Sequence, residues 1–160
     1  MMIEDYAQAI GKIVANLQGL ELLIRSFLHD TLDAQNGAHQ QPFPLDVAVG
    51  IELPADHLTN YDTLGKLIDK YNEVNPPINK YLVDLRDALA HGRVLGEIES
   101  SHYRLLKFSK PVNGRVKVTH NEELTEEWLK SRLEMTYTAI KEVVYRSSAL
   151  RKPGGVEVAE

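Results

Sequence analysis

The sequence predicts an all-α protein, a four-helix up-and-down bundle with a small β-hairpin or meander inserted before the last helix. Three observations support this class. Apolar residues recur at helical spacing in four separate stretches. The period changes to alternation around one Asn-Gly pair before the fourth stretch. The chain has 160 residues, 43% of them hydrophobic, and no cysteine, so it needs one core without disulfides. We expect a domain over residues 1–150 and a flexible tail over 151–160.

The first predicted helix covers residues 3–33, where apolar side chains recur at steps of three, four or seven. Glu21 falls on this apolar stripe beside Leu17 and Leu20, so its carboxylate needs a partner. Residues 34–57 contain three prolines and two glycines and show no helical period. A loop of that length is usually functional or locally ordered, but the sequence assigns it no role.

The second and third predicted helices are short. Helical spacing returns over residues 58–71 and again over 78–89, and two prolines in series separate the two stretches. Gly92 is placed as the C-terminal cap of the third helix.

The predicted β-insert covers about residues 93–120. Alternating segments at 104–108 and 115–119 flank an Asn113-Gly114 turn, and residues 94–98 offer a third strand. The last helix then needs an N-cap, for which Thr125 and Asn121 are both candidates. Four acidic residues lie where the positive end of its dipole is expected: Glu122, Glu123, Glu126 and Glu127.

The charge distribution limits the function. A formal net charge of −5 argues against a nucleic-acid coat over the whole chain. Residues 101–121 nevertheless hold five bases and no acid, so this segment is either a solvated hairpin or a ribbon that faces phosphates. No run approaches the ~20 apolar residues of a membrane span. The early acidic residues Glu4 and Asp5 argue against a secretory signal, so we expect a cytoplasmic protein.

Most motifs of catalysis and metal binding are missing from the sequence. There is no glycine-rich phosphate loop, and no two histidines lie three or four positions apart. We therefore expect neither a metal nor a cofactor. Five of the six histidines lack a supporting context and are expected to be surface or structural residues: His29, His39, His57, His102 and His120.

His91 differs because it ends a predicted helix five positions after Arg86. An imidazole and a guanidinium can cut RNA without a metal, since one moves protons near neutral pH and the other holds phosphate oxygens. Five residues of straight helix leave the two side chains about 140° apart. They converge only if the helix loosens at His91 or a second copy completes the site. Alternatively, Arg86 pairs with a nearby acid and His91 only interacts with the helix C-terminus.

The segment Arg86-Asp87-Ala88-Leu89-Ala90-His91-Gly92 resembles the Arg-x(4–6)-His signature of the HEPN superfamily. The Leu20-Glu21 and Leu64-Gly65 steps in the preceding helices are also similar to that family. The resemblance implies an all-helical, HEPN-like fold and a homodimer in which two motifs face each other. It implies a metal-independent ribonuclease with Arg86 and His91 as catalytic residues, Asp87 orienting one of them and Glu21 in support. Many such proteins belong to toxin–antitoxin or defence systems and have an antitoxin partner.

Arg93 departs from one version of the family pattern, because some toxins carry a tyrosine there as the target of a nucleotidyltransferase antitoxin. We instead expect Arg93 to contact phosphate together with bases of the hairpin: Arg104, Lys107, Arg115 and Lys117. Three hypotheses stay open. The chain is a dimeric ribonuclease, a non-catalytic HEPN-like module that binds a nucleotide, RNA or protein, or an unrelated helical interaction protein.

Overall fold

The computed structural model describes residues 3–33, 46–96 and 102–150. The predicted tail at 151–160 and most of the long loop lie outside these ranges. In chain order the elements are α1 (Ile3–Leu28), η1 (His29–Asp33), α2 (Leu64–Val74), α3 (Tyr81–His91), β1 (Arg93–Gly96), β2 (Tyr103–Phe108), β3 (Val118–Glu123) and α4 (Glu126–Leu150). The element η1 is one π-helical turn that continues α1.

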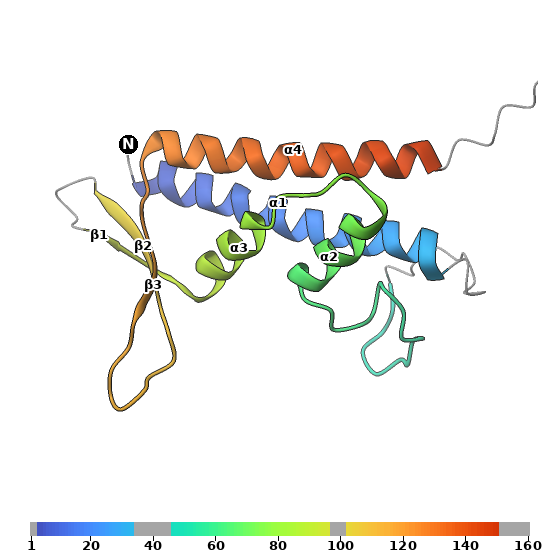
Figure 1. The fold of residues 1–160 in the computed structure, drawn as a ribbon, viewed down its shortest axis with the longest axis horizontal. Helices are drawn as coiled ribbons and strands as arrows, with labels where there is room; N and C mark the ends of the chain where they lie inside the picture. Colours follow the sequence, from blue (N-terminus) through green and yellow to red (C-terminus); the bar gives the residue numbers. More distant parts are fainter. Residues whose placement is uncertain (1–2, 34–45, 97–101, 151–160) are drawn as a thin grey trace, which may run out of the picture.

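The long helices α1 and α4 lie side by side and run in the same direction (Figure 1). Asn16 Nδ2 donates to Thr136 Oγ1 at 3.0 Å between them. An up-and-down bundle would make its first and last helices antiparallel, so that prediction is wrong. The two middle helices, α2 and α3, have 11 residues each against 26 for α1, and they run in different directions (Figure 1). α2 ends beside the end of α1, where Val74 and Asn75 line one pocket with Thr31 and Leu32, and α3 then runs back along α1 (Figure 1). Only one of the two middle helices therefore returns the chain, which leaves α1 and α4 parallel.

The all-α class is also wrong, because 59% of the described residues are helical and 14% are in strands, a mixed α/β arrangement. The strands form an antiparallel sheet in the order β1-β2-β3. This sheet reaches the core through β2, whereas β1 is exposed along its length. Leu105 of β2 and Leu124, which follows β3, are both fully buried in the same apolar cluster as the helices. A three-stranded sheet that shares the helical core changes the fold class.

The predicted Asn-Gly turn is confirmed. Asn113 and Gly114 both have positive φ, 50° and 71°, and Val112 and Arg115 exchange backbone hydrogen bonds across them. These are the φ signs of a type I′ hairpin turn. The paired strand β3 lies further along the chain than predicted, since Phe108 pairs with Val118 across an irregularity in the register.

The start of α4 resolves the choice of N-cap. Asn121 pairs with Leu106 inside the sheet, whereas Thr125 Oγ1 accepts a hydrogen bond from the Trp128 backbone N–H at 3.0 Å. Thr125 is therefore the cap. Glu122 and Glu123, expected in the first helical turn, belong to β3 instead.

Gly92 lies at the junction of α3 and β1, where it caps α3 as predicted and its N–H donates to Ala88 O at 2.7 Å. Its φ is −80°, so the position does not need the left-handed region. It needs the missing side chain, because a Cβ would lie 2.2 Å from Ala88 O and 2.9 Å from Leu105 Cδ1. This close approach fixes the geometry around His91.

Within the described ranges, no helix is both long enough and apolar enough to cross a lipid bilayer.

Candidate functional site

Arg86 lies on the exposed side of α3, at a groove of about 490 Å³ between α1 and α3. Glu21 and Arg25 of α1 line the same groove, together with the apolar residues Val14, Leu17, Leu22 and Leu89. Arg86 makes no side-chain hydrogen bond or ion pair within the described part of the chain. Its guanidinium is therefore available to an anionic ligand.

Asp87 and His91 share another face of α3, above β2. His91 Nε2 lies 3.6 Å from Asp87 Oδ1, and Lys107 of β2 donates to Asp87 Oδ2. The hydrogen bond from Lys107 lowers the pKa of Asp87 below its ordinary value, and the charges of Lys107, His91 and Arg86 add to the effect. Asp87 is thus an ionised carboxylate beside the imidazole.

Arg86 and His91 do not converge within one chain. The α-helix is regular through His91, so the two side chains keep their separation of about 140°. The helix therefore does not loosen, which was one of the two routes to a shared site. His91 is 63% exposed and Arg86 is exposed, so both can still be reached from outside the chain.

The carboxylate of Glu21, which was expected to need a partner on the apolar stripe, forms an ion pair with Arg25. Arg25 Nη2 and Nε lie 3.0 and 3.3 Å from Glu21 Oε1. The same guanidinium donates to the backbone carbonyls of His57, Asn60 and Asp62. The Arg25 side chain is only 12% exposed, so α1 uses it to hold the chain before α2. Sequence reasoning missed Arg25, although its i,i+4 spacing from Glu21 was a usable signal.

The predicted basic ribbon is divided by local ion pairing. Arg104 Nε donates to Asn121 Oδ1 at 2.8 Å and its Nη1 lies 3.6 Å from Glu123, while Lys107 binds Asp87. The Arg93 guanidinium stands 5.7 Å above the Phe108 ring. Two further bases lie near the exposed hairpin turn and have no side-chain partner among the residues described: Arg115 and Lys117. The side chains of these last two bases are therefore free to bind an anionic ligand.

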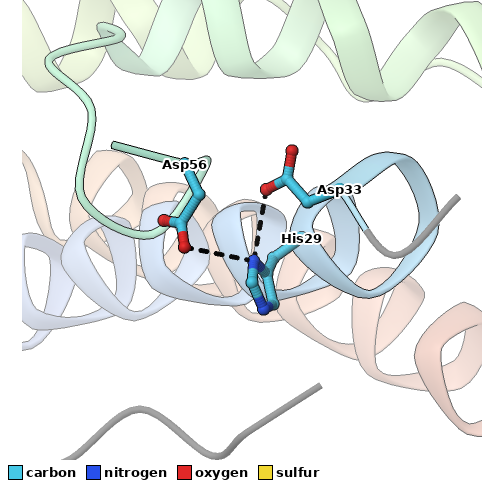
Figure 2. A group of neighbouring side chains, drawn as sticks. All are labelled: His29, Asp33 and Asp56. Carbon is cyan, nitrogen blue, oxygen red and sulfur yellow. Dashed lines mark hydrogen bonds and ion pairs between the residues drawn. The ribbon is translucent and has the colours of Figure 1, made fainter. Parts of the chain in front are cut away.

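A second group of titratable residues lies far from α3, at the end of α1. His29 and Asp33 come from the π-helical turn, and Asp56 comes from the segment before α2 (Figure 2). His29 Nδ1 lies 3.2 Å from Asp33 Oδ2 and 3.6 Å from Asp56 Oδ2. His29 is only 8% exposed, so of the two expectations for it, a surface or a structural residue, the structural one agrees with its burial.

His57 joins this group through Asp33. Its backbone N–H donates to Asp33 Oδ2 at 2.9 Å, and its Nδ1 lies 2.7 Å from Asp33 Oδ1. Its Nε2 lies 3.1 Å from Lys70 Nζ, which also donates to Asp62 at 2.8 Å. An ammonium group is only a donor, so His57 Nε2 accepts and Nδ1 carries the proton. The His57 side chain is likewise mostly buried, at 13% exposed.

Asp33 is held as an anion by this network. Burial raises the pKa of its carboxyl, but the hydrogen bonds from His57 and His29 outweigh burial, and the pKa lies below its ordinary value. The sequence carried one local signal of the group, the i,i+4 spacing of His29 and Asp33. This pair joins a histidine to an aspartate, so the spacing between histidines does not reveal it.

Comparison with protein families, with curated proteins and with solved structures found no significant match to the chain. The chemistry of both groups is therefore argued from their side chains.

Proposed function

We propose that the chain is a metal-independent endoribonuclease of the HEPN type, acting as a homodimer. One observation carries the proposal: Arg86 and His91 are both open to solvent on one regular helix, with the ionised Asp87 between them in sequence. Exposed groups of this kind on opposite sides of a helix suit a site completed by a second copy. The resemblance of the Arg86–Gly92 segment to HEPN motifs supports the same arrangement.

The reaction needs a group that removes a proton, a group that donates a proton and a cation that stabilises negative charge, and these side chains can supply all three. A neutral His91 removes the proton of a ribose 2′-hydroxyl, whose oxygen attacks the adjacent phosphorus. A protonated His91 of the second copy gives a proton to the departing 5′-oxygen, which leaves a 2′,3′-cyclic phosphate. Arg86 stabilises the negative charge that develops on the phosphorane oxygens. Asp87, 3.6 Å from His91, positions the imidazole.

The groove beside Arg86 also offers apolar area to a second copy. Leu22 is 60% exposed there, and Val14 and Leu89 line the same groove. Arg93, Arg115 and Lys117 would then attract the RNA backbone. A place in a toxin–antitoxin or defence system, with an antitoxin as partner, is proposed from the resemblance alone.

The test is cleavage of a mixed-sequence RNA in EDTA by the full-length chain at known oligomeric state. We expect His91→Ala and Arg86→Ala to lower cleavage by about 10²–10⁴-fold each while leaving the fold intact. The matched control is His102→Ala, which removes an exposed histidine that is paired with Glu123 in the sheet. Products of the wild type should carry 2′,3′-cyclic phosphate ends. Equal cutting by wild type and both active-site variants contradicts the proposal.

A second candidate is a non-catalytic HEPN-like module that binds a nucleotide or RNA. The net charge of −5 favours it. A folded dimer that cuts no RNA, yet binds a nucleotide or short RNA saturably and loses that binding in Arg86→Ala, identifies the module.

A further inference from the structure

We propose that His29, Asp33 and Asp56 bind a divalent transition-metal ion of the zinc class. The site is separate from the groove and from the Arg86–His91 motif, and it does not depend on the proposed nuclease activity. It joins the π-helical turn after α1 to the segment that leads into α2 (Figure 2).

The spacing of the three donor atoms matches a metal site. His29 Nδ1 lies 3.2 and 3.6 Å from the nearest oxygens of Asp33 and Asp56, and all three donors fall within 4.8 Å of one another. Ligands at about 2.0–2.1 Å from a tetrahedral zinc ion stand about 3.3 Å apart. The two distances from His29 Nδ1 are close to this value.

The hydrogen bonding of His29 also favours an ion. One imidazole Nδ1 faces two carboxylates, and it has at most one proton to share between them. Both carboxylates are mostly buried, and two anions facing each other need a compensating charge. A divalent cation bound by the Nδ1 lone pair satisfies all three groups at once.

The surrounding structure holds the two carboxylates in place. Asp56 Oδ1 accepts hydrogen bonds from the backbone N–H groups of Leu58 and Thr59, so its Oδ2 is the oxygen left to face His29. His57 holds both oxygens of Asp33: its Nδ1 contacts Oδ1, and its backbone N–H donates to Oδ2, the oxygen that also faces His29. Contacts of this outer kind orient ligands and raise metal affinity.

The donor set selects the class of ion. An imidazole nitrogen favours zinc and its transition-metal neighbours over magnesium and calcium, which prefer oxygen alone. Three protein ligands leave a fourth position for water. The ion would fasten η1 to the segment around His57, whose carbonyl binds Arg25 at the groove.

The test is titration of the full-length, tag-free chain with Zn²⁺ after treatment with a chelator, followed by calorimetry. We expect one equivalent to bind the wild type and the affinity of Asp56→Asn to fall by at least about 100-fold, beyond the range of outer contacts. An asparagine keeps the Oδ1 acceptor for Leu58 and Thr59 and removes the ligand oxygen. The matched control is His102→Ala, which should bind Zn²⁺ as the wild type does.

Titration with Co²⁺ provides a second readout, because four-coordinate Co²⁺ absorbs strongly in the visible range. We expect this band in the wild type and in His102→Ala, and its loss in Asp56→Asn and His29→Gln. The proposal is overturned if Asp56→Asn binds Zn²⁺ as tightly as the wild type, or if His102→Ala loses as much affinity as Asp56→Asn. Should the ligand variants fail to fold, a wild type without the Co²⁺ band overturns it equally.

Discussion

The Arg86–His91 motif of α3 and the cluster at the π-helical turn after α1, here called the π-turn cluster, differ in how far their charged side chains are buried and paired. We define the cluster as His29, Asp33, Asp56 and His57. In the motif, Arg86 and His91 are exposed on separate sides of one helix. In the cluster, side chains that are mostly buried come from two segments more than 20 residues apart and bind one another directly.

This contrast separates two kinds of site. A group of exposed residues can be changed with little effect on folding, because water already solvates them. Buried charged residues support the fold and their loss is costly, since each leaves a partner without a counter-charge. If the motif is the RNA site and the cluster a metal and structural site, substitutions in the two regions must affect different measurements.

The largest stability effect is expected for Arg25→Ala, which acts on the segment that contains His57. It removes a nearly buried guanidinium from Glu21 and from three backbone carbonyls. We expect a loss of about 3–5 kcal/mol in the free energy of unfolding, measured by urea denaturation. Arg86→Ala is the matched control and should change that free energy by less than about 0.5 kcal/mol. Similar losses for both arginines would remove the contrast between the regions.

The next largest stability effect is expected for Gly92→Ala, which lies at the end of the Arg86–Gly92 segment. The added Cβ would meet Ala88 O at 2.2 Å and Leu106 O at 3.0 Å, so the α3–β1 junction must shift. We expect a loss of about 1–3 kcal/mol. Gly11→Ala in α1 is the control, because nothing lies within 4 Å of its Cβ position, and it should stabilise the protein by about 0.5–1 kcal/mol. Equal thermal shifts for the two variants would show that close packing does not explain Gly92.

The features that could be predicted from the sequence are those that depend on residues close together in the chain. The four helices, the Asn113-Gly114 turn, the Thr125 cap and the placement of Gly92 follow from spacing and local chemistry. The parallel course of α1 and α4 depends instead on α2 and α3 running in different directions, which local spacing does not determine. The role of the sheet depends on whether Leu105 reaches the helical core, which alternation alone cannot state.

The candidate site shows the same division. The separation of Arg86 and His91 followed from helix geometry, and Glu21 could be expected to need a partner. Local spacing pairs only His29 with Asp33, whereas Asp56 and His57 join them from beyond the long loop, so the full cluster needs the folded chain. Pairing of Lys107 with Asp87, which removes a base from the predicted ribbon, likewise needs the packing of β2 on α3.

A smaller effect, which depends on pH, is expected for Asp33→Asn. The folded pKa of Asp33 lies below its ordinary value of 3.8, so its ionisation stabilises the fold above that pH and the contribution is lost as pH falls through the folded pKa. At pH 7 we expect Asp33→Asn to lose about 1.5 kcal/mol, because an amide accepts weaker hydrogen bonds from His57. Urea denaturation at decreasing pH should show the gap to wild type narrowing below about pH 4. A gap that stays constant contradicts this assignment.

The smallest effect is expected for Asp87→Asn, the counterpart of Asp33→Asn on α3. The pKa of Asp87 is also lowered, mainly by Lys107, but its side chain is 41% exposed whereas that of Asp33 is 15% exposed. Exposed ion pairs contribute about 0–1 kcal/mol and are screened by salt. Adding NaCl to about 1 M should therefore bring the urea midpoints of wild type and Asp87→Asn together, since the Debye length falls to about 3 Å. The gap for Asp33→Asn should persist, because its hydrogen bonds are shielded from salt; if salt closes both gaps equally, burial does not distinguish the two aspartates.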